Sequence, residues 1–255
     1  MMAIRLFLSG CNGRMGQMIR SIVAASPDLS VVAGSDLKPD AQAAFPVYAD
    51  PGQCREAFDV LVDFSNAEAV PALCSLIEQR HCPSVICTTG LSESTKQRLI
   101  DLSAGAPVFI SANMSLGINL MISLVRQAAK LLYPDFDLEL IEAHHNQKLD
   151  APSGTALMIA DQINDALDHQ LIYVYDRSQV RQKRDSHELG LHAIRGGSIV
   201  GDHTVLFAGP DETLEIKHQA QSRAVFARGA LAAARFLADK PAGLYNMQDL
   251  LASGT

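Results

Sequence analysis

The first 36 residues contain an apolar strand, a glycine-rich turn, an amphipathic helix and a second strand, and this order limits the folds open to the chain. The apolar segment Ile4–Ser9 leads into the sequence GCNGRMG at residues 10–16, and a helical apolar periodicity follows at residues 18–23. A second strand at residues 30–35 ends at Asp36. A strand, a glycine turn and a helix in this order are typical of parallel α/β domains, in which the turn approaches a ligand.

The same alternation continues to about residue 111. Short apolar runs at residues 60–63, 84–88 and 108–111 predict further strands, and residues 68–79 and 93–102 have helical patterns. Polar segments follow two of these strands, at residues 87–90 and 111–115. Ligands of parallel sheets lie beyond the carboxyl ends of the strands. The pattern therefore predicts an α/β fold with a Rossmann-like, doubly wound parallel sheet and a ligand at that edge.

Composition excludes several classes of protein. A net charge of −7 disfavours a broad nucleic-acid surface. We expect no membrane association and a cytoplasmic location, because no apolar segment is long enough for a membrane span or a signal peptide. The five cysteines include no C-x-x-C pair, so they predict reduced thiols and neither a disulfide framework nor a zinc site.

The glycine turn departs from the general dinucleotide pattern. Gly10, Gly13 and Gly16 give G-x-x-G-x-x-G instead of G-x-G-x-x-G, but a helix start still follows the turn. Asp36 stands 20 residues after Gly16, where a carboxylate can accept hydrogen bonds from a ribose. We therefore predict a dinucleotide site. The alternative is a glycine-rich turn without a ligand.

Residues 142–156, EAHHNQKLDAPSGTA, combine two histidines, a lysine and a Pro-Ser-Gly-Thr turn between an apolar run and a helical pattern. Proton donors are thus predicted at a strand end, beside a helix start that can bind a carboxylate. The alternative is a structural or surface histidine pair. Adjacent histidines without a further spaced ligand do not predict a metal site, and His203 and His218 are interpreted as solvated or structural.

Further motifs stand along the chain beside residues 10–16 and 142–156: VDFS at 62–65, TTG at 88–90, NMSLGIN at 113–119, RGGSIVGDHT at 195–204 and SR at 222–223. Together these motifs resemble one family, 4-hydroxy-tetrahydrodipicolinate (dihydrodipicolinate) reductase of diaminopimelate and lysine biosynthesis. The resemblance extends over nearly the whole chain, and residues 142–156 are its most specific part.

The resemblance implies an oxidoreductase that uses NADH or NADPH to reduce 4-hydroxy-tetrahydrodipicolinate, a small dicarboxylate, to tetrahydrodipicolinate. Residues 1–115 and 223–255 would form the dinucleotide-binding domain. Residues 116–222 would form an α+β domain with a mixed sheet for substrate binding and tetramerisation. Strands at residues 191–195, 204–208 and 213–219 would join a homotetramer. The apolar alternation of Val205, Phe207, Leu214 and Ile216 predicts a sheet face that needs cover.

The family also implies roles for individual residues. His144 would donate the proton, and Lys148 would be the second catalytic group. The substrate carboxylates would bind His145 and the backbone of Gly154 and Thr155. The pyrophosphate would be held by Gly10, Cys11, Asn12, Gly13, Arg14 and Met15. The nicotinamide end would be surrounded by Cys87, Thr88, Thr89, Ser111, Ala112, Asn113 and Met114.

Two departures from the family pattern concern the cofactor. Cys87 stands where glycine is usual, which narrows the space near the nicotinamide. Leu37 stands where a basic residue often follows the acid, and Lys38 comes one position later. Asp36 favours the ribose diol of NADH, whereas Lys38, with help from Arg14, can bind the 2′-phosphate of NADPH. We expect both cofactors to work, with NADH modestly preferred.

The sequence is also compatible with two other classes of protein. One is a different nicotinamide-dependent enzyme on the same two-domain plan, such as an amino-acid dehydrogenase. The other is a non-catalytic cofactor-sensing protein, which would need the glycine turn and Asp36 but neither His144 nor Lys148. A further expectation concerns residues 176–188, whose polar composition predicts a mobile loop.

Overall fold

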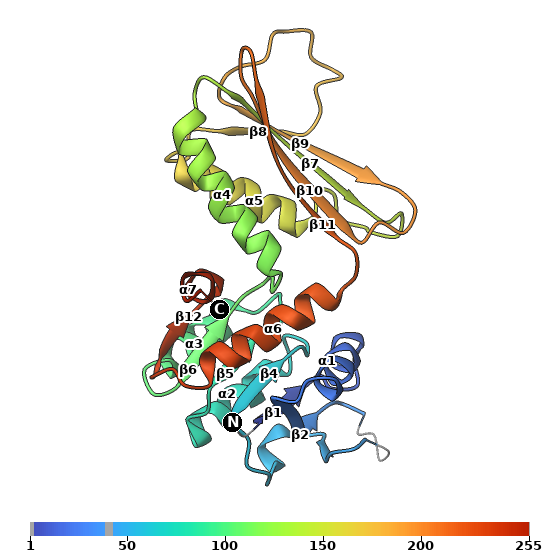
Figure 1. The fold of residues 1–255 in the computed structure, drawn as a ribbon, viewed down its shortest axis with the longest axis vertical. Helices are drawn as coiled ribbons and strands as arrows, with labels where there is room; N and C mark the ends of the chain where they lie inside the picture. The colour runs from blue at the N-terminus through green and yellow to red at the C-terminus, as the bar shows by residue number, and fades with distance from the viewer. Residues whose placement is uncertain (1–2, 39–42, 255) are drawn as a thin grey trace. The chain divides into compact units, whose positions relative to one another are not determined.

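The computed structural model describes residues 3–38 and 43–254, which form two compact units (Figure 1). The first unit comprises Met1–Leu116 and Ala224–Thr255, and the second comprises Gly117–Arg223. Each unit is built on one sheet with its own hydrophobic core.

The sheet of the first unit is entirely parallel, with the order β12-β6-β5-β4-β1-β2-β3. This confirms the doubly wound sheet predicted from the sequence. Its short outer strands β3 and β12 were not predicted. The seven strands are β1 (Ile4–Ser9), β2 (Leu29–Ser35), β3 (Val47–Tyr48), β4 (Val60–Asp63), β5 (Ser84–Ile86), β6 (Pro107–Ile110) and β12 (Gly243–Tyr245).

Helices cover both faces of this sheet. Helices α1 (Arg14–Ala24) and α6 (Ala224–Leu237) pack on one face, and α2 (Val70–Arg80) and α3 (Glu93–Leu102) pack on the other. Two short elements complete the unit, the 3₁₀ turn η1 (Pro51–Gln53) and helix α7 (Met247–Ala252). Strands buried on both faces have continuous apolar sequences, because alternate residues enter opposite cores. This is why β1 and β4 were evident in the sequence.

The candidate cofactor residues lie at the topological switch point of the parallel sheet. β1 lies between β2 and β4, so successive connections from the centre run to opposite sides of the sheet. Parallel sheets bind ligands at such a switch point, beyond the carboxyl ends of the strands. The glycine turn follows β1 at this edge, and the polar segments after β4, β5 and β6 lie along the same edge.

The sheet of the second unit is mixed, as predicted, with the order β11-β10-β7-β9-β8. β10 is antiparallel to both β7 and β11, whereas β9 is parallel to both β7 and β8. Two helices accompany it, α4 (Leu116–Leu132) and α5 (Gly154–Ala166). The strands are β7 (Asp137–His144), β8 (Ile172–Val174), β9 (Glu188–Arg195), β10 (Gly201–Ala208) and β11 (Thr213–Ala220).

Helices α4 and α5 pack on one face of the mixed sheet, and this corrects one interpretation of the sequence (Figure 1). Val205 and Phe207 are fully buried beneath these helices, and Ile216 packs against the same core. Three of the four apolar residues of the alternation therefore face the chain's own helices, whereas Leu214, on the same face, is 42% exposed. The alternation alone is thus no argument for a subunit contact. The opposite face carries a mixture that includes Glu139, Ile194 and Lys217.

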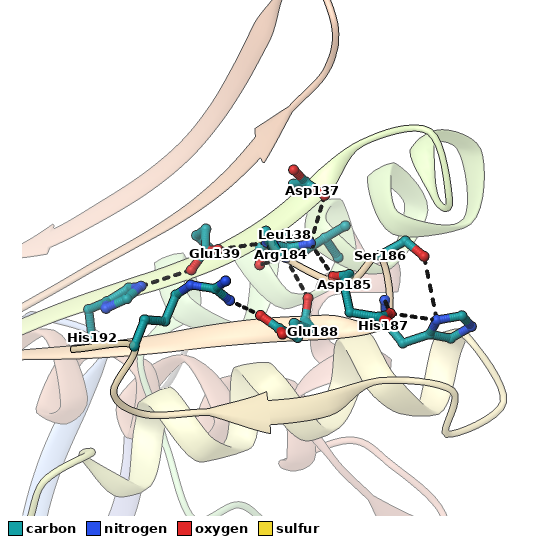
Figure 2. Close-up of polar contacts among 10 residues, drawn as sticks. Asp137, Leu138, Glu139, Arg184, Asp185, Ser186, His187, Glu188 and His192 are labelled. Carbon is teal, nitrogen blue, oxygen red and sulfur yellow. Dashed lines mark hydrogen bonds and ion pairs between the residues drawn. The ribbon is translucent and has the colours of Figure 1, made fainter. Parts of the chain in front are cut away.

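The loop between β8 and β9, expected to be mobile, is tied to the sheet by arginines (Figure 2). The guanidinium of Arg184 donates to Asp137 Oδ1 at 2.6 Å, to Glu139 Oε1 at 3.0 Å and to the Leu138 carbonyl at 2.9 Å. Arg177 forms an ion pair with Glu188. These bonds attach the loop to β7 and to the start of β9.

The described residues also bear on disulfides, membrane spans and metal sites. All five cysteines are free and buried. Within residues 3–38 and 43–254, no helix is both long and apolar enough to cross a bilayer. The same residues contain no group of three or more histidine, cysteine or acidic side chains that could hold a metal ion.

Candidate active site

The glycine turn after β1 is built so closely that side chains would disrupt it. Gly10 has φ of +73°, and a Cβ there would lie 2.5 Å from the Phe64 carbonyl oxygen. A Cβ at Gly16 would lie 2.2 Å from the Gly10 carbonyl oxygen. Gly13 is the N-cap of α1 and has no side chain to cap the helix. The backbone at this helix start is therefore suited to binding an anion.

Asp36 is held beside this turn by backbone donors. Its Oδ2 accepts the Asn12 N–H at 3.0 Å, and its Oδ1 accepts the Lys38 N–H at 3.2 Å. The Asn12 side chain donates to the Lys38 carbonyl at 2.6 Å. An ionised carboxylate has about four acceptor positions, so Asp36 keeps capacity for a ribose diol. The contacts also bring Lys38 to the turn.

A cavity of about 330 Å³ opens between the glycine turn and the end of β4. Its size, its glycines and the oriented carboxylate fit the adenosine part of a dinucleotide. The lining residues include Gly10, Gly13, Asp36, Leu37, Phe64 and Ser65.

Asp63, at the end of β4, links the segment that follows its own strand to the segment after β5, which is predicted to surround the nicotinamide. Its fully buried carboxylate accepts the Ser65 hydroxyl at 2.6 Å and the Thr88 hydroxyl at 2.7 Å. Burial raises the pKa of Asp63, although the hydrogen bonds from Ser65 and Thr88 oppose that effect. Its position at the strand end fixes the start of the segment after β5. No role for Asp63 was predicted from the sequence.

The segments after β5 and β6 have distinct environments. Cys87 is buried, and burial raises its pKa well above the ordinary value, so the thiol is neutral. Ser111 Oγ donates to the Asn113 carbonyl at 2.8 Å, and Asn113 Oδ1 accepts the Ser115 N–H at 2.9 Å. These bonds fold residues 111–115 into a compact turn at the carboxyl edge of the sheet. Thr89 and Ala112 are exposed there.

In the second unit, Glu142 is the centre of a buried polar cluster at the end of β7. Its Oε2 lies 2.6 Å from His144 Nδ1 and 2.9 Å from Arg195 Nη1. Its Oε1 lies 2.7 Å from Arg195 Nη2 and 3.0 Å from the Ser153 amide nitrogen. Burial alone would raise the pKa of Glu142, but the hydrogen bonds from Arg195 and His144 outweigh it and lower the pKa. Glu142 is therefore ionised at neutral pH.

The turn between β7 and α5 holds the remaining predicted residues of this unit. Ser153 caps α5 by accepting the Ala156 N–H at 3.2 Å, and Gly154 has an open position with no atom near its missing Cβ. Lys148 Nζ lies 2.9 Å from Asp150 Oδ1, and this hydrogen bond lowers the pKa of Asp150. His145 lies in the same turn, with its carbonyl accepting the Lys148 N–H at 3.1 Å.

His203 belongs to this cluster, so its burial supports the structural one of the two interpretations made from the sequence, solvated or structural. It is 3% exposed, its ring lies edge-on to His144 with centroids 5.4 Å apart, and its Nε2 lies 3.2 Å from Ser153 Oγ. Burial, and secondly the charge of His144, lowers the pKa of His203 to about 4. His203 is thus neutral at neutral pH. Its alternation with Val205 and Phe207 was a signal that it points inward.

The structure brings the predicted residues together within each unit. The residues predicted to bind the cofactor lie along the carboxyl edge of the parallel sheet in the first unit. His144, His145, Lys148, Gly154 and Thr155 lie on one strand-to-helix turn in the second. Glu142, Arg195 and Asp63 are the residues whose importance was missed. Glu142 and Arg195 stood within quoted motifs, but no sequence signal pairs residues 53 positions apart.

Comparison with known proteins assigns the chain to a family. Models of dihydrodipicolinate reductase match it in two parts, the N-terminus at residues 4–114 and the C-terminus at residues 117–251. The 4-hydroxy-tetrahydrodipicolinate reductase of Caldanaerobacter subterraneus subsp. tengcongensis is 51% identical, over 99% of this chain and 100% of the relative. That of Clostridium tetani is 47% identical, over 98% of each.

A solved structure agrees with the sequence comparisons. Dipicolinate-bound dihydrodipicolinate reductase from Paenisporosarcina sp. TG-14 has a TM-score of 0.82 and 25% identity to this chain, covering 96% of this chain and 98% of that one. Both units and both sequence parts therefore lead to the same assignment. The chain belongs to the dihydrodipicolinate reductase family.

Proposed function

We propose that this chain catalyses the NADH- or NADPH-dependent reduction of 4-hydroxy-tetrahydrodipicolinate to tetrahydrodipicolinate, in diaminopimelate and lysine biosynthesis, with His144 as the proton donor. Family membership supports the reaction. The observation that supports the site is the placement of His144 at the end of β7, paired with an ionised Glu142 and adjoining the capped start of α5.

The first unit would hold the cofactor. The backbone of residues 10–15 would bind its pyrophosphate, Asp36 and Lys38 would contact the adenosine ribose, and residues 87–89 and 111–114 would surround the nicotinamide. The cavity beside Gly10 and the oriented Asp36 carboxylate fit such a ligand. When bound, the reduced nicotinamide supplies a hydride.

The second unit would bind the substrate and supply the proton. Dipicolinate, the ligand of the Paenisporosarcina relative, has two carboxylates. The backbone at Gly154 and Thr155 would bind one of them, because a helix start favours anions, and His145 would bind the other. His144 Nε2 would deliver the proton, since Nδ1 is directed at Glu142. Lys148 would stabilise negative charge that develops on the substrate.

The assembly and location are also proposals. We propose a homotetramer joined through the mixed sheets, on the basis of the family and of the sheet face that this chain's helices leave open. We propose a cytoplasmic location, which the five free thiols support because cysteines stay reduced there. Light scattering at micromolar concentration tests the tetramer, and a stable monomer would contradict it.

A substrate panel tests the proposed reaction. The purified chain should oxidise NADH and NADPH, measured as a loss of their absorbance, when 4-hydroxy-tetrahydrodipicolinate is supplied. It should not oxidise them with amino acids or 2-oxo acids. Turnover of those compounds alone would favour a different nicotinamide-dependent dehydrogenase. Binding of reduced cofactor without turnover of any substrate would favour a cofactor-sensing protein. Either outcome would refute the proposal.

A further inference from the structure

The proposed reaction requires a proton donor and a carboxylate site, but it gives no reason for a fully buried Glu142. This side chain is 1% exposed and receives hydrogen bonds from three different segments of the chain. A buried carboxylate destabilises a fold unless it is paired and hydrogen-bonded. Arg195 Nη1 and Nη2 each donate to one carboxylate oxygen of Glu142. This bidentate geometry gives the strongest ion pairs between an arginine and a carboxylate.

The contacts of Glu142 determine which nitrogen of His144 faces outward. An ionised carboxylate only accepts hydrogen bonds, so His144 Nδ1 must carry a hydrogen. Nε2 is then the nitrogen available to other groups. It lies towards Gly201, where a Cβ would be 3.1 Å from it. The missing side chain at residue 201 therefore leaves space at Nε2.

The same carboxylate also fixes the start of α5. Glu142 Oε1 accepts the Ser153 N–H, and Ser153 is the N-cap of that helix. Arg195 extends the connection, because its Nη2 donates to the Asp150 carbonyl at 2.7 Å. One ion pair thus holds both the histidine and the turn that precedes the helix.

We propose that Glu142, held by Arg195, is the positioning residue that fixes the ring and tautomer of His144 and aligns it with the start of α5. Glu142 stabilises the imidazolium before the proton leaves, as the carboxylate does in a Ser-His-Asp triad. His203 remains neutral beside it and adds no competing charge. The inference rests on the proposed function, because it assigns the means by which His144 acts.

The protein contains a matched control for this cluster on the opposite face of β7. Glu139 also binds one histidine and one arginine, with His192 Nε2 at 2.8 Å and Arg184 Nε at 3.0 Å (Figure 2). Glu139 lies three residues before Glu142 and takes no part in the candidate site. Replacing it therefore removes the same kind of contact from the same strand without changing the proposed proton donor.

The test is a double-mutant cycle between Glu142→Gln and His144→Ala, with steady-state kcat as the readout. Glu142→Gln should lower kcat about 10²-fold or more, because the amide can donate to Nδ1 and favour the wrong tautomer. In the His144→Ala background the same change should have almost no further effect. Glu139→Gln should leave kcat unchanged in both backgrounds. Glu142→Asp, which keeps the charge, should recover part of the loss.

The outcomes separate the inference from the proposed function. If His144→Ala keeps its turnover, the donor role is wrong and the inference fails with it. If His144→Ala loses turnover but Glu142→Gln lowers kcat equally with and without His144, Glu142 does not act through His144 and only the inference is overturned. ¹⁵N NMR of the neutral imidazole adds a direct readout: His144 should carry its hydrogen on Nδ1, and Glu142→Gln should shift it towards Nε2.

A variant that folds poorly does not prevent the test. Arg195→Lys keeps a positive charge but loses the two-pronged contact, so it should also lower kcat only when His144 is present. Thermal unfolding and NADH binding by fluorescence check that each variant is folded. An Arg195→Lys variant that is folded, binds NADH and turns over normally would overturn the part of the inference that concerns Arg195.

Discussion

The buried His203 should make the protein less stable in mild acid. Its pKa in the folded chain is about 4, below the ordinary value of 6.5, because burial disfavours its charged form. Between these two pH values the unfolded chain binds a proton that the folded chain does not. The free energy of unfolding is therefore at its full value above about pH 6.5, falls as the pH decreases, and has lost the whole contribution near pH 4.

The expected size follows from the difference between the two pKa values. At about 1.4 kcal/mol for each pH unit, His203 should remove about 3 kcal/mol of stability when the pH falls from 7 to below 4, and about 2 kcal/mol by pH 4.5. This is a large part of the stability of an ordinary domain, which is about 5–15 kcal/mol. Other titrating groups add their own contributions, so the comparison must be made between variants.

Denaturant unfolding at pH 7 and pH 4.5 measures the effect. His203→Gln, which can keep a hydrogen bond to Ser153, should lose about 2 kcal/mol less than the unaltered chain between the two pH values. His169→Asn is the control, because the His169 side chain is 74% exposed. If His203→Gln and the unaltered chain lose equal stability, the assignment of His203 as a buried neutral residue is refuted.

The other predictions concern the cofactor, the lysine and one packing position. Lys38→Ala should raise KM for NADPH and leave KM for NADH almost unchanged, and Asp36→Ala should do the reverse; equal effects on both cofactors would show that these residues do not distinguish the 2′ position. Lys148→Met should lose turnover but unfold at nearly the same temperature, because its ion pair with the exposed Asp150 adds at most about 1 kcal/mol; normal turnover would contradict its role. Gly229→Ala should destabilise the protein by about 1–3 kcal/mol in denaturant unfolding, since its Cβ would lie 1.7 Å from the Met114 carbonyl oxygen; unchanged stability would contradict the packing.

Local sequence signals predicted the central elements well. The apolar runs of β1 and β4 and the capped helix α3 have the bounds that the sequence indicated. Strands β3, β8 and β12 were missed because two or three residues are too few to show a periodicity. Each forms by pairing with one strand of an existing sheet, β3 with β2, β8 with β9 and β12 with β6, and only the folded chain shows those partners.

The site was predicted as a set of residues but not as a mechanism. The family resemblance supplied His144 and Lys148, and the alternation of β10 contained the signal that His203 is buried. The pairing of Glu142 with Arg195 depends on the parallel contact between β7 and β9, which places Arg195 beside His144. The alternation of Val205 and Phe207 predicted an apolar face that needs cover, but it did not identify helices α4 and α5 as the cover, because strand periodicity separates two faces without showing what packs on each.

The most direct test of the account is the turnover of His144→Gln with 4-hydroxy-tetrahydrodipicolinate, measured together with the Kd for NADH. We expect kcat to fall by about 10²–10⁴-fold, the usual contribution of a general acid, while the Kd stays unchanged because the residues proposed to bind the cofactor lie in the first unit. A folded variant whose kcat equals that of the unaltered chain would show that His144 does not donate the proton.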